Sequence, residues 1–126
     1  MKKEWSKHWK SSKQPRKQRK YSFNAPLHIK RKFFAAHLSK ELKTKYGKRS
    51  FVLRKGDKVK IMRGKFKDKI GNVEKVLTRR NRIFIEGANF VKRDGNKIYY
   101  PIHPSNVLIT ELILEDKKRK KSLERK

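Results

Sequence analysis

The sequence predicts a mostly β protein built around a small barrel, flanked by a basic N-terminal extension, two short helices and a basic C-terminal helix. Nearly all strand patterns fall in residues 50–110, as about five or six short apolar runs separated by turn residues at intervals of roughly eight to twelve positions. An open antiparallel sheet of this size would expose its edges, whereas closure into a barrel covers them. With only 34% hydrophobic residues, the core is expected to be modest.

The chain of 126 residues fits one domain with tails. Shifts in composition divide it into four segments. A basic, partly disordered extension is predicted for residues 1–24, and two short helices for residues 25–49. The barrel is predicted for residues 50–110 and a basic C-terminal helix for residues 111–126.

The charge balance points to a polyanionic partner. Charged residues make up 40% of the chain and the formal net charge is +28, so nucleic acid is the expected partner. The absence of cysteine excludes disulfides and thiolate metal sites. No apolar run approaches the ~20 residues of a membrane helix, and the basic N-terminus lacks the apolar segment of a signal peptide. We therefore expect a cytoplasmic protein that has no membrane partner.

The N-terminal segment interleaves cations with aromatic residues. Trp5, Trp9 and Tyr21 lie among lysines and arginines, and Pro15 is expected to interrupt any helix. Because the segment has little apolar surface, we predict that it is disordered when free and folds on RNA. A flat ring can stack on an unpaired base while lysines contact phosphates. The alternative is that the two tryptophans pack on the domain.

Residues 25–49 carry the signals of two short helices. Pro26 can start the first, Ser39 is a plausible N-cap of the second, and Gly47 ends it. Four apolar residues spaced four apart predict a packing stripe that docks on the barrel: Phe34, Leu38, Leu42 and Tyr46. A membrane-surface helix is the less favoured interpretation, because the apolar face is thin and interrupted.

Residues 54–76 form the central hairpin of the predicted barrel. A turn at Lys55-Gly56-Asp57 leads into a strand in which Val59 and Ile61 face one side. A basic loop over residues 63–69 follows, and Gly71 starts the second strand. A rigid hairpin that carries a mobile cationic loop suits a phosphate backbone, although an ordinary basic surface hairpin is the alternative.

The remaining barrel signals follow in order. Residues 79–82 form a basic turn before a strand at 83–85, and Asp94-Gly95 is the strongest hairpin signal in the chain. A closing strand is predicted at 107–109. His103 lies in the preceding tight turn, where it is expected to stabilise the turn or contact RNA.

The C-terminal segment reads as a basic helix. Glu115–Arg119 and Asp116–Lys120 have the spacing of favourable i,i+4 ion pairs. We expect this helix to lie along a nucleic-acid backbone, while a simply solvated helix is the alternative.

Signals of catalysis and metal binding are absent from the sequence. The four histidines show no metal-ligand spacing, and there is no phosphate-binding glycine motif, nucleophile elbow or carboxylate pair in an apolar context. The sequence therefore predicts a protein that is not an enzyme and has no cofactor, metal or small-molecule substrate.

The central hairpin resembles the KOW module of ribosomal proteins and transcription factors. The resemblance rests on Gly56-Asp57, Val59, Gly64, Lys67, Gly71 and Val73. One departure is Asp68, where the motif usually has glycine. Because Asp tolerates left-handed geometry better than most residues, the turn is expected to survive. A carboxylate there would face phosphates unless a lysine neutralised it.

Further stretches extend the resemblance from about Pro15 to the end of the chain. They are PRKQRK, NAPLHIKRK, LSKELKTKYGKRS, YYPIHPSNV and KKSLERK. Together with the hairpin they resemble the KOW family of large-subunit ribosomal proteins, universal number twenty-four, called twenty-six in eukaryotes. Asn106 in PIHPSNV makes the chain look more archaeal than eukaryotic. Residues 1–14 lie outside the resemblance.

The resemblance implies an SH3-like barrel and a structural role in the large ribosomal subunit. It implies binding to the 5′ domain of large-subunit rRNA early in assembly, a position near the polypeptide exit tunnel, and neighbouring ribosomal proteins as partners. By matched position, Gly64, Lys65, Lys67 and Gly71 would lie on RNA. The alternatives are a KOW-domain transcription regulator, whose companion domain has no room here, and a generic nucleic-acid-binding protein such as a DNA compactor.

The cationic segments and the resemblance together supply a set of candidate RNA-binding residues. In chain order they are Lys13, Arg16, Lys17, Arg19, Lys20, Tyr21, His28, Lys30, Arg31, Lys32, Arg49, Arg54, Lys55, Arg63, Gly64, Lys65, Lys67, Lys69, Gly71, Arg79, Arg80, Arg82, His103, Lys117, Lys118 and Arg119.

Overall fold

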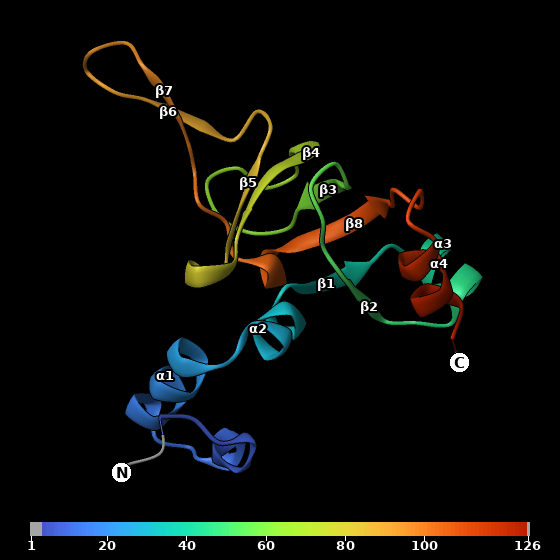
Figure 1. Ribbon diagram of the computed structural model, residues 1–126. Helices are drawn as coiled ribbons and strands as arrows, with labels where there is room; N and C mark the ends of the chain where they lie inside the picture. Colours follow the sequence, from blue (N-terminus) through green and yellow to red (C-terminus); the bar gives the residue numbers. More distant parts are fainter. Residues whose placement is uncertain (1–3, 126) are drawn as a thin grey trace.

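A mixed six-stranded sheet is the centre of the computed structural model, which describes residues 4–125 (Figure 1). Its strands are, in spatial order, β2 (Ser50–Val52), β1 (Ala35–Leu38), β8 (Val107–Glu111), β3 (Lys58–Ile61), β4 (Ile70–Leu77) and β5 (Arg82–Ile85). β1 and β8 run parallel, and the other neighbours are antiparallel. A separate hairpin of β6 (Asn89–Val91) and β7 (Lys97–Tyr99) projects away from the sheet (Figure 1).

Helices take up much of the described chain. They are the α-helices α1 (Pro15–Asn24), α2 (Leu27–Phe33), α3 (Lys40–Tyr46) and α4 (Lys117–Glu124), and the 3₁₀ helices η1 (Lys7–Ser11), η2 (Thr78–Arg80) and η3 (Pro104–Asn106). The fold is therefore mixed α/β, and the prediction of a mostly β protein is wrong. In the strand pairings of residues 4–125, β2 and β5 are the end strands of the sheet. Closure into a barrel stays a prediction.

The core follows the two-residue alternation that the sequence predicts for the central hairpin. Val59 and Ile61 of β3 are 0% and 1% exposed, and the alternation in β5 buries Ile83 and Ile85 completely. Burying a side chain of this size contributes roughly 1.5–3 kcal/mol. The regular alternation is therefore enough to keep one face of the sheet on the core.

Residues 35–38 form a strand that the sequence analysis missed. β1 pairs with β2 and lies parallel to β8, and the amide of Ser39 donates to the carbonyl of Ile109 at 2.9 Å. Phe34 caps α2 and Leu38 belongs to β1, so the four residues do not share one helix face. Both side chains are nonetheless buried in the core, and Leu42 packs against the core, as the predicted stripe requires. The element was mispredicted because an i,i+4 spacing does not distinguish a helix face from a helix end followed by a strand.

The two predicted helices of residues 25–49 are confirmed. α2 begins directly after Pro26, and Ser39 caps α3 by accepting a hydrogen bond from the amide of Leu42 at 3.3 Å. Gly47 ends α3 in the left-handed conformation with φ of 63°. This geometry carries no steric cost for glycine.

Within the described part of the N-terminal extension, residues 7–11 form η1 and residues 15–24 form α1. Disorder of the free extension stays a prediction. Pro15 is the first residue of α1 and does not interrupt it, since the first turn of a helix needs no amide hydrogen from that position. Trp5 packs on Tyr21 with ring centroids 5.5 Å apart, and Tyr21 packs on Phe33 at 6.1 Å. Trp5 therefore packs within the extension itself, and packing of the two tryptophans on the domain stays a prediction.

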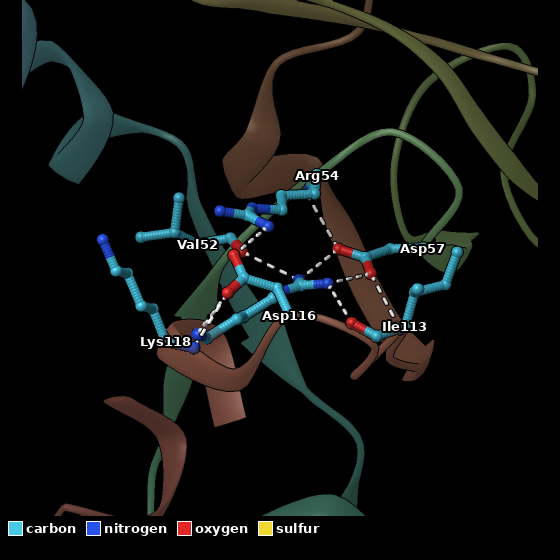
Figure 2. A network of polar contacts seen from close by, with 7 residues as sticks. Val52, Arg54, Asp57, Ile113, Asp116 and Lys118 are labelled. Carbon is cyan, nitrogen blue, oxygen red and sulfur yellow. Dashed lines mark hydrogen bonds and ion pairs between the residues drawn. The ribbon is translucent and has the colours of Figure 1, made fainter. Parts of the chain in front are cut away.

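The C-terminal helix packs on the sheet through a polar network that the sequence analysis did not anticipate (Figure 2). Arg119 of α4 donates to both carboxylate oxygens of Asp57, at 2.7 and 2.6 Å. Asp116 accepts from the backbone amides of Lys118 and Arg119 and from the side chain of Arg54. The predicted i,i+4 pairs are wrong, because tertiary partners occupy Arg119 and Asp116.

The projecting hairpin is confirmed at the predicted Asp94-Gly95 turn. β6 and β7 pair Asn89 with Tyr99 and Val91 with Lys97. Gly95 lies at φ of 80°, and its amide donates to the carbonyl of Lys92 at 3.0 Å. In residues 4–125, no helix is long and apolar enough to cross a membrane.

Candidate nucleic-acid interface

The loop between β3 and β4 is held in one shape by its own backbone. The amide of Ile61 donates to the carbonyl of Lys69 at 2.8 Å, and the amide of Asp68 donates to the carbonyl of Ile61 at the same distance. The amide of Lys67 donates to the carbonyl of Gly64 at 3.0 Å. The predicted loop is therefore a hydrogen-bonded turn tied to the end of the hairpin, and its mobility stays a prediction.

Phe66 anchors this loop in the core. Its side chain is only 7% exposed and packs on Tyr100, with ring centroids 5.3 Å apart. The surrounding cations are exposed, and they are Arg63, Lys65, Lys67 and Lys69. A buried aromatic centre with cations around it presents charge at a defined position, which suits contacts to phosphates.

Asp68 takes the left-handed conformation predicted for it, with φ of 66°. Its carboxylate lies 3.0 Å from the ammonium group of Lys60. The hydrogen bond and the charge of Lys60, with a smaller contribution from Lys67, lower the pKa of Asp68 below its ordinary value. The carboxylate is thus paired with a lysine, as the sequence analysis required for an acid at this position of the predicted RNA-binding loop.

Gly71, predicted to contact RNA, has a packing role in the structure. A Cβ at this position would lie 2.4 Å from the carbonyl oxygen of Glu86 and 3.0 Å from Cγ2 of Ile85. β4 and β5 can approach this closely only because Gly71 lacks a side chain.

A second group of cations lies beside the loop. Residues of the β3–β4 loop and of the segment before η3 line a cleft of about 170 Å³, which brings together Arg63, Lys65, Arg82 and His103. Nδ1 of His103 lies 2.8 Å from Oγ of Ser105, which confirms the predicted turn-stabilising role. Burial and then the charge of Arg82 lower the pKa of His103 below its ordinary value.

The basic turn before β5 is confirmed. Arg79 and Arg80 belong to η2, and Asn81 is left-handed with φ of 50°. Both arginines are exposed, whereas Arg82 in β5 is half-buried and donates to the carbonyl of Asn81 at 3.1 Å.

The N-terminal helices carry a separate cationic surface. On α1, Arg16, Lys17 and Arg19 are exposed, and Lys20 lies 4.9 Å above the ring of Trp9. Lys13 precedes the helix and is exposed, while Tyr21 is half-buried between two aromatic rings. The ring of Tyr21 already has protein neighbours, so it is a poorer candidate for stacking on a base than the sequence suggested.

The remaining candidates lie on α2, in the connections and on α4. On α2, His28, Arg31 and Lys32 are exposed, and Lys30 donates to the carbonyl of Phe23 at 2.8 Å. Arg49 is exposed before β2. Lys117 and Lys118 are exposed on α4, and Lys118 lines a cleft of about 280 Å³ together with Arg31 and Arg54.

Three predicted cations already have carboxylate partners. Arg54 lies 2.6 Å from Asp116, and Lys55 lies 3.7 Å from Glu74. Arg119 is the clearest correction, since its side chain is 4% exposed and is bound to Asp57. The run of cations around Arg119 predicts a contact to RNA. The face of α4 that carries Arg119, however, packs against the protein.

Two aromatic residues outside the predicted set of site residues, on β5 and β7, also lie beside each other. Phe84 of β5 is half-buried and lies beside Tyr99 of β7, with ring centroids 5.9 Å apart. The alternation of β5 was a usable signal, because buried residues at 83 and 85 place Phe84 on the opposite face. Within the described range 4–125, no group of three or more His, Asp or Glu residues could hold a metal ion.

The amino-acid sequence of the chain matches a known protein family. The family model, which describes the eukaryotic ribosomal proteins L26 and their archaeal L24 counterparts, matches residues 12–126. A curated relative, large ribosomal subunit protein uL24 of Methanosphaera stadtmanae, is 49% identical over 115 residues, which are 91% of this chain and 98% of the relative. The family match begins close to Lys13, the first cation of the predicted interface.

Proposed function

Because the chain belongs to the family of eukaryotic ribosomal proteins L26 and their archaeal L24 counterparts, we propose that it binds the 5′ domain of large-subunit rRNA as a structural constituent of the large ribosomal subunit. Its role is structural and not enzymatic. rRNA and neighbouring ribosomal proteins are its partners.

The observation that carries the proposal is the closed β3–β4 loop. Its exposed cations surround the buried ring of Phe66, and its one acid is neutralised by Lys60. The loop therefore presents positive charge at fixed positions without net repulsion of phosphates. Such contacts position a protein on the backbone of a nucleic acid and read its shape more than its sequence.

Exposed cations also lie on elements other than the loop. Arg79 and Arg80 belong to η2, and Arg16, Lys17 and Arg19 lie on the separate cationic surface of α1. A protein that contacts RNA at several distant points suits a folded rRNA domain better than a linear duplex. This favours the ribosomal role over a DNA compactor.

We propose further that the chain joins the subunit early in assembly and lies near the rim of the polypeptide exit tunnel. Membership of the family supports this placement. A transcription regulator is the second candidate, but the family model spans residues 12–126 and so accounts for nearly the whole chain.

The test is equilibrium binding of the full chain to the isolated 5′ domain, titrated over salt, with duplex DNA as competitor. Each phosphate contact should contribute a log–log slope of roughly −0.7 to −0.9, so a steep salt dependence is expected. Affinity for rRNA that survives excess DNA supports the proposal. Equal competition by DNA would contradict it and favour generic nucleic-acid binding.

A further inference from the structure

Phe84 and Tyr99 form an aromatic pair on the outer side of the β4–β5 region. Their ring planes enclose 31° at a centroid distance of 5.9 Å. Tyr99 is 39% exposed, and Phe84 is half-buried although its neighbours in β5 are fully buried. Core packing therefore does not account for the exposed parts of these rings.

Two grooves meet at this pair. One, of about 920 Å³, lies between α2 and the end of β4, with Leu27 and Val76 among its apolar lining residues. The other, of about 610 Å³, is lined by Phe23, Leu77 and Pro101. Phe84 and Tyr99 line both grooves, so each groove offers room for a flat apolar group against the aromatic pair.

Both grooves have cations among their lining residues. Arg31 and Lys75 line the first groove, and Arg80 and Arg82 line the second. None of these four forms an ion pair with another described residue. Glu74 is the one acid among the lining residues, and it lies 3.7 Å from the ammonium group of Lys55.

An unpaired nucleotide matches this combination of surfaces. Its base is a flat ring that stacks on aromatic side chains, and its phosphates are anions that bind arginine. An apolar protein segment would match the groove lining but would leave the four cations without partners. Charge complementarity therefore favours RNA as the occupant.

We propose that Phe84 and Tyr99 are a stacking site for an unpaired nucleotide of large-subunit rRNA, with Arg31, Arg80 and Arg82 placed to bind its flanking phosphates. This inference rests on the proposed rRNA-binding function and names a site for one kind of nucleotide within it. Because stacking tolerates any base, the site selects single-stranded RNA and not a particular base.

The test compares the full chain with a variant that carries Phe84→Leu and Tyr99→Leu. Leucine retains apolar volume but removes the flat ring. We expect roughly ten-fold weaker binding to the 5′ domain of large-subunit rRNA, which is the scale of lost base stacking. The slope of affinity against salt should not change, because no phosphate contact is removed.

Phe90→Leu is the matched control. Phe90 is a 42% exposed aromatic residue on the same hairpin and lines neither groove. This control should bind rRNA as the unchanged protein does. Circular dichroism of all variants should show the same thermal transition, so that a loss of binding is not a loss of folding.

Ultraviolet crosslinking of the unchanged protein to the same rRNA supplies a second, independent readout. We expect mass spectrometry to find a nucleotide adduct on the peptide that carries Phe84 or Tyr99. The stacking site would be overturned if the double variant bound rRNA with unchanged affinity and the adducts lay only on other peptides. A neighbouring protein would then be the better occupant of the grooves. If the unchanged protein itself did not prefer rRNA to duplex DNA, the proposed function would fail instead.

Discussion

Arg119 and Asp57 form a buried, two-pronged ion pair across 62 residues of sequence, with both guanidinium–carboxylate distances at or below 2.7 Å. Asp57 also accepts from the backbone amides of Arg54 and Ile113, and Arg119 donates to the carbonyls of Ile113 and Val52 (Figure 2). The pair therefore joins the turn before β3 to the C-terminal helix, and its polar atoms are well supplied with partners.

Breaking this ion pair from one side should be strongly destabilising. Arg119→Met leaves the carboxylate of Asp57 buried without its cation, and we expect a loss of roughly 3–5 kcal/mol in the free energy of unfolding. Urea denaturation measures the loss. The control is Arg54→Gln, which removes a partly exposed pair with Asp116 and should cost less than about 1 kcal/mol. Equal effects of the two variants would contradict the assigned role.

Replacement of Gly71 should destabilise the sheet more than backbone strain alone can explain. Gly71→Ala places a methyl group against the carbonyl oxygen of Glu86, so β4 and β5 must separate. We expect a cost of more than about 2 kcal/mol, since overpacking typically costs 1–3 kcal/mol. Gly47→Ala is the control, because its Cβ meets no atom within 4 Å and only the positive φ opposes it. A smaller loss for Gly71→Ala than for Gly47→Ala would sink this account.

The charge of Lys67 should contribute to rRNA affinity through a phosphate contact. Lys67→Glu is expected to weaken binding and to reduce the slope of log affinity against log salt by about 1. Lys40→Glu, which reverses an exposed charge at the start of α3, should leave the slope nearly unchanged. An unchanged dissociation constant for Lys67→Glu at moderate salt would refute the loop assignment.

The carboxyl group of Asp68 should titrate below the ordinary value of 3.8 in the folded protein. A lowered pKa in the folded state means that its pairing with Lys60 stabilises the fold above the unfolded pKa and is lost as the pH falls through the folded pKa. NMR titration of Asp68 checks this at acidic pH. Lys60→Gln should raise the pKa of Asp68 more than Lys67→Gln does, because Lys60 is the larger cause.

Removal of residues 1–24 should weaken rRNA binding and leave the sheet folded. The aromatic residues Trp5 and Tyr21 of this segment pack on each other and on Phe33, and none of its described residues belongs to the main core cluster. Truncation after Asp116 supplies the contrast, because it removes Arg119 and the fully buried Leu123. Scanning calorimetry should show a thermal transition when residues 1–24 are removed. Truncation after Asp116 should give a transition at a much lower temperature, or none.

Several elements of the fold were predictable because their signals are local. Two-residue alternation predicted β3, and an apolar run after a basic turn predicted β5. The Asp94-Gly95 turn predicted the projecting hairpin, and the cap at Ser39 predicted the start of α3. The left-handed Asp68 followed from the tolerance of that residue type. Each of these depends on residues within a few positions of one another, so tertiary contacts did not change the outcome.

Elements that depend on distant partners were missed or misread. β1 is short and contains two alanines, and it is a strand because β2 and β8 pair with it on either side. Pro15 opens a helix where it was expected to interrupt one, since its effect depends on which turn it occupies. In the sequence Arg119 is one of several cations on a basic helix, whereas in the structure Asp57 lies beside it and binds it.

The sequence by itself determined the excess of positive charge, the central hairpin with its basic loop, and the resemblance to a ribosomal family that the comparisons confirm. The tertiary structure alone decided which cations are left for RNA and which are bound to carboxylates. It also placed Phe84 beside Tyr99 between two grooves. The physical reason is that composition and short-range pattern set the total charge and the local geometry, whereas the partner of each side chain is set by long-range packing.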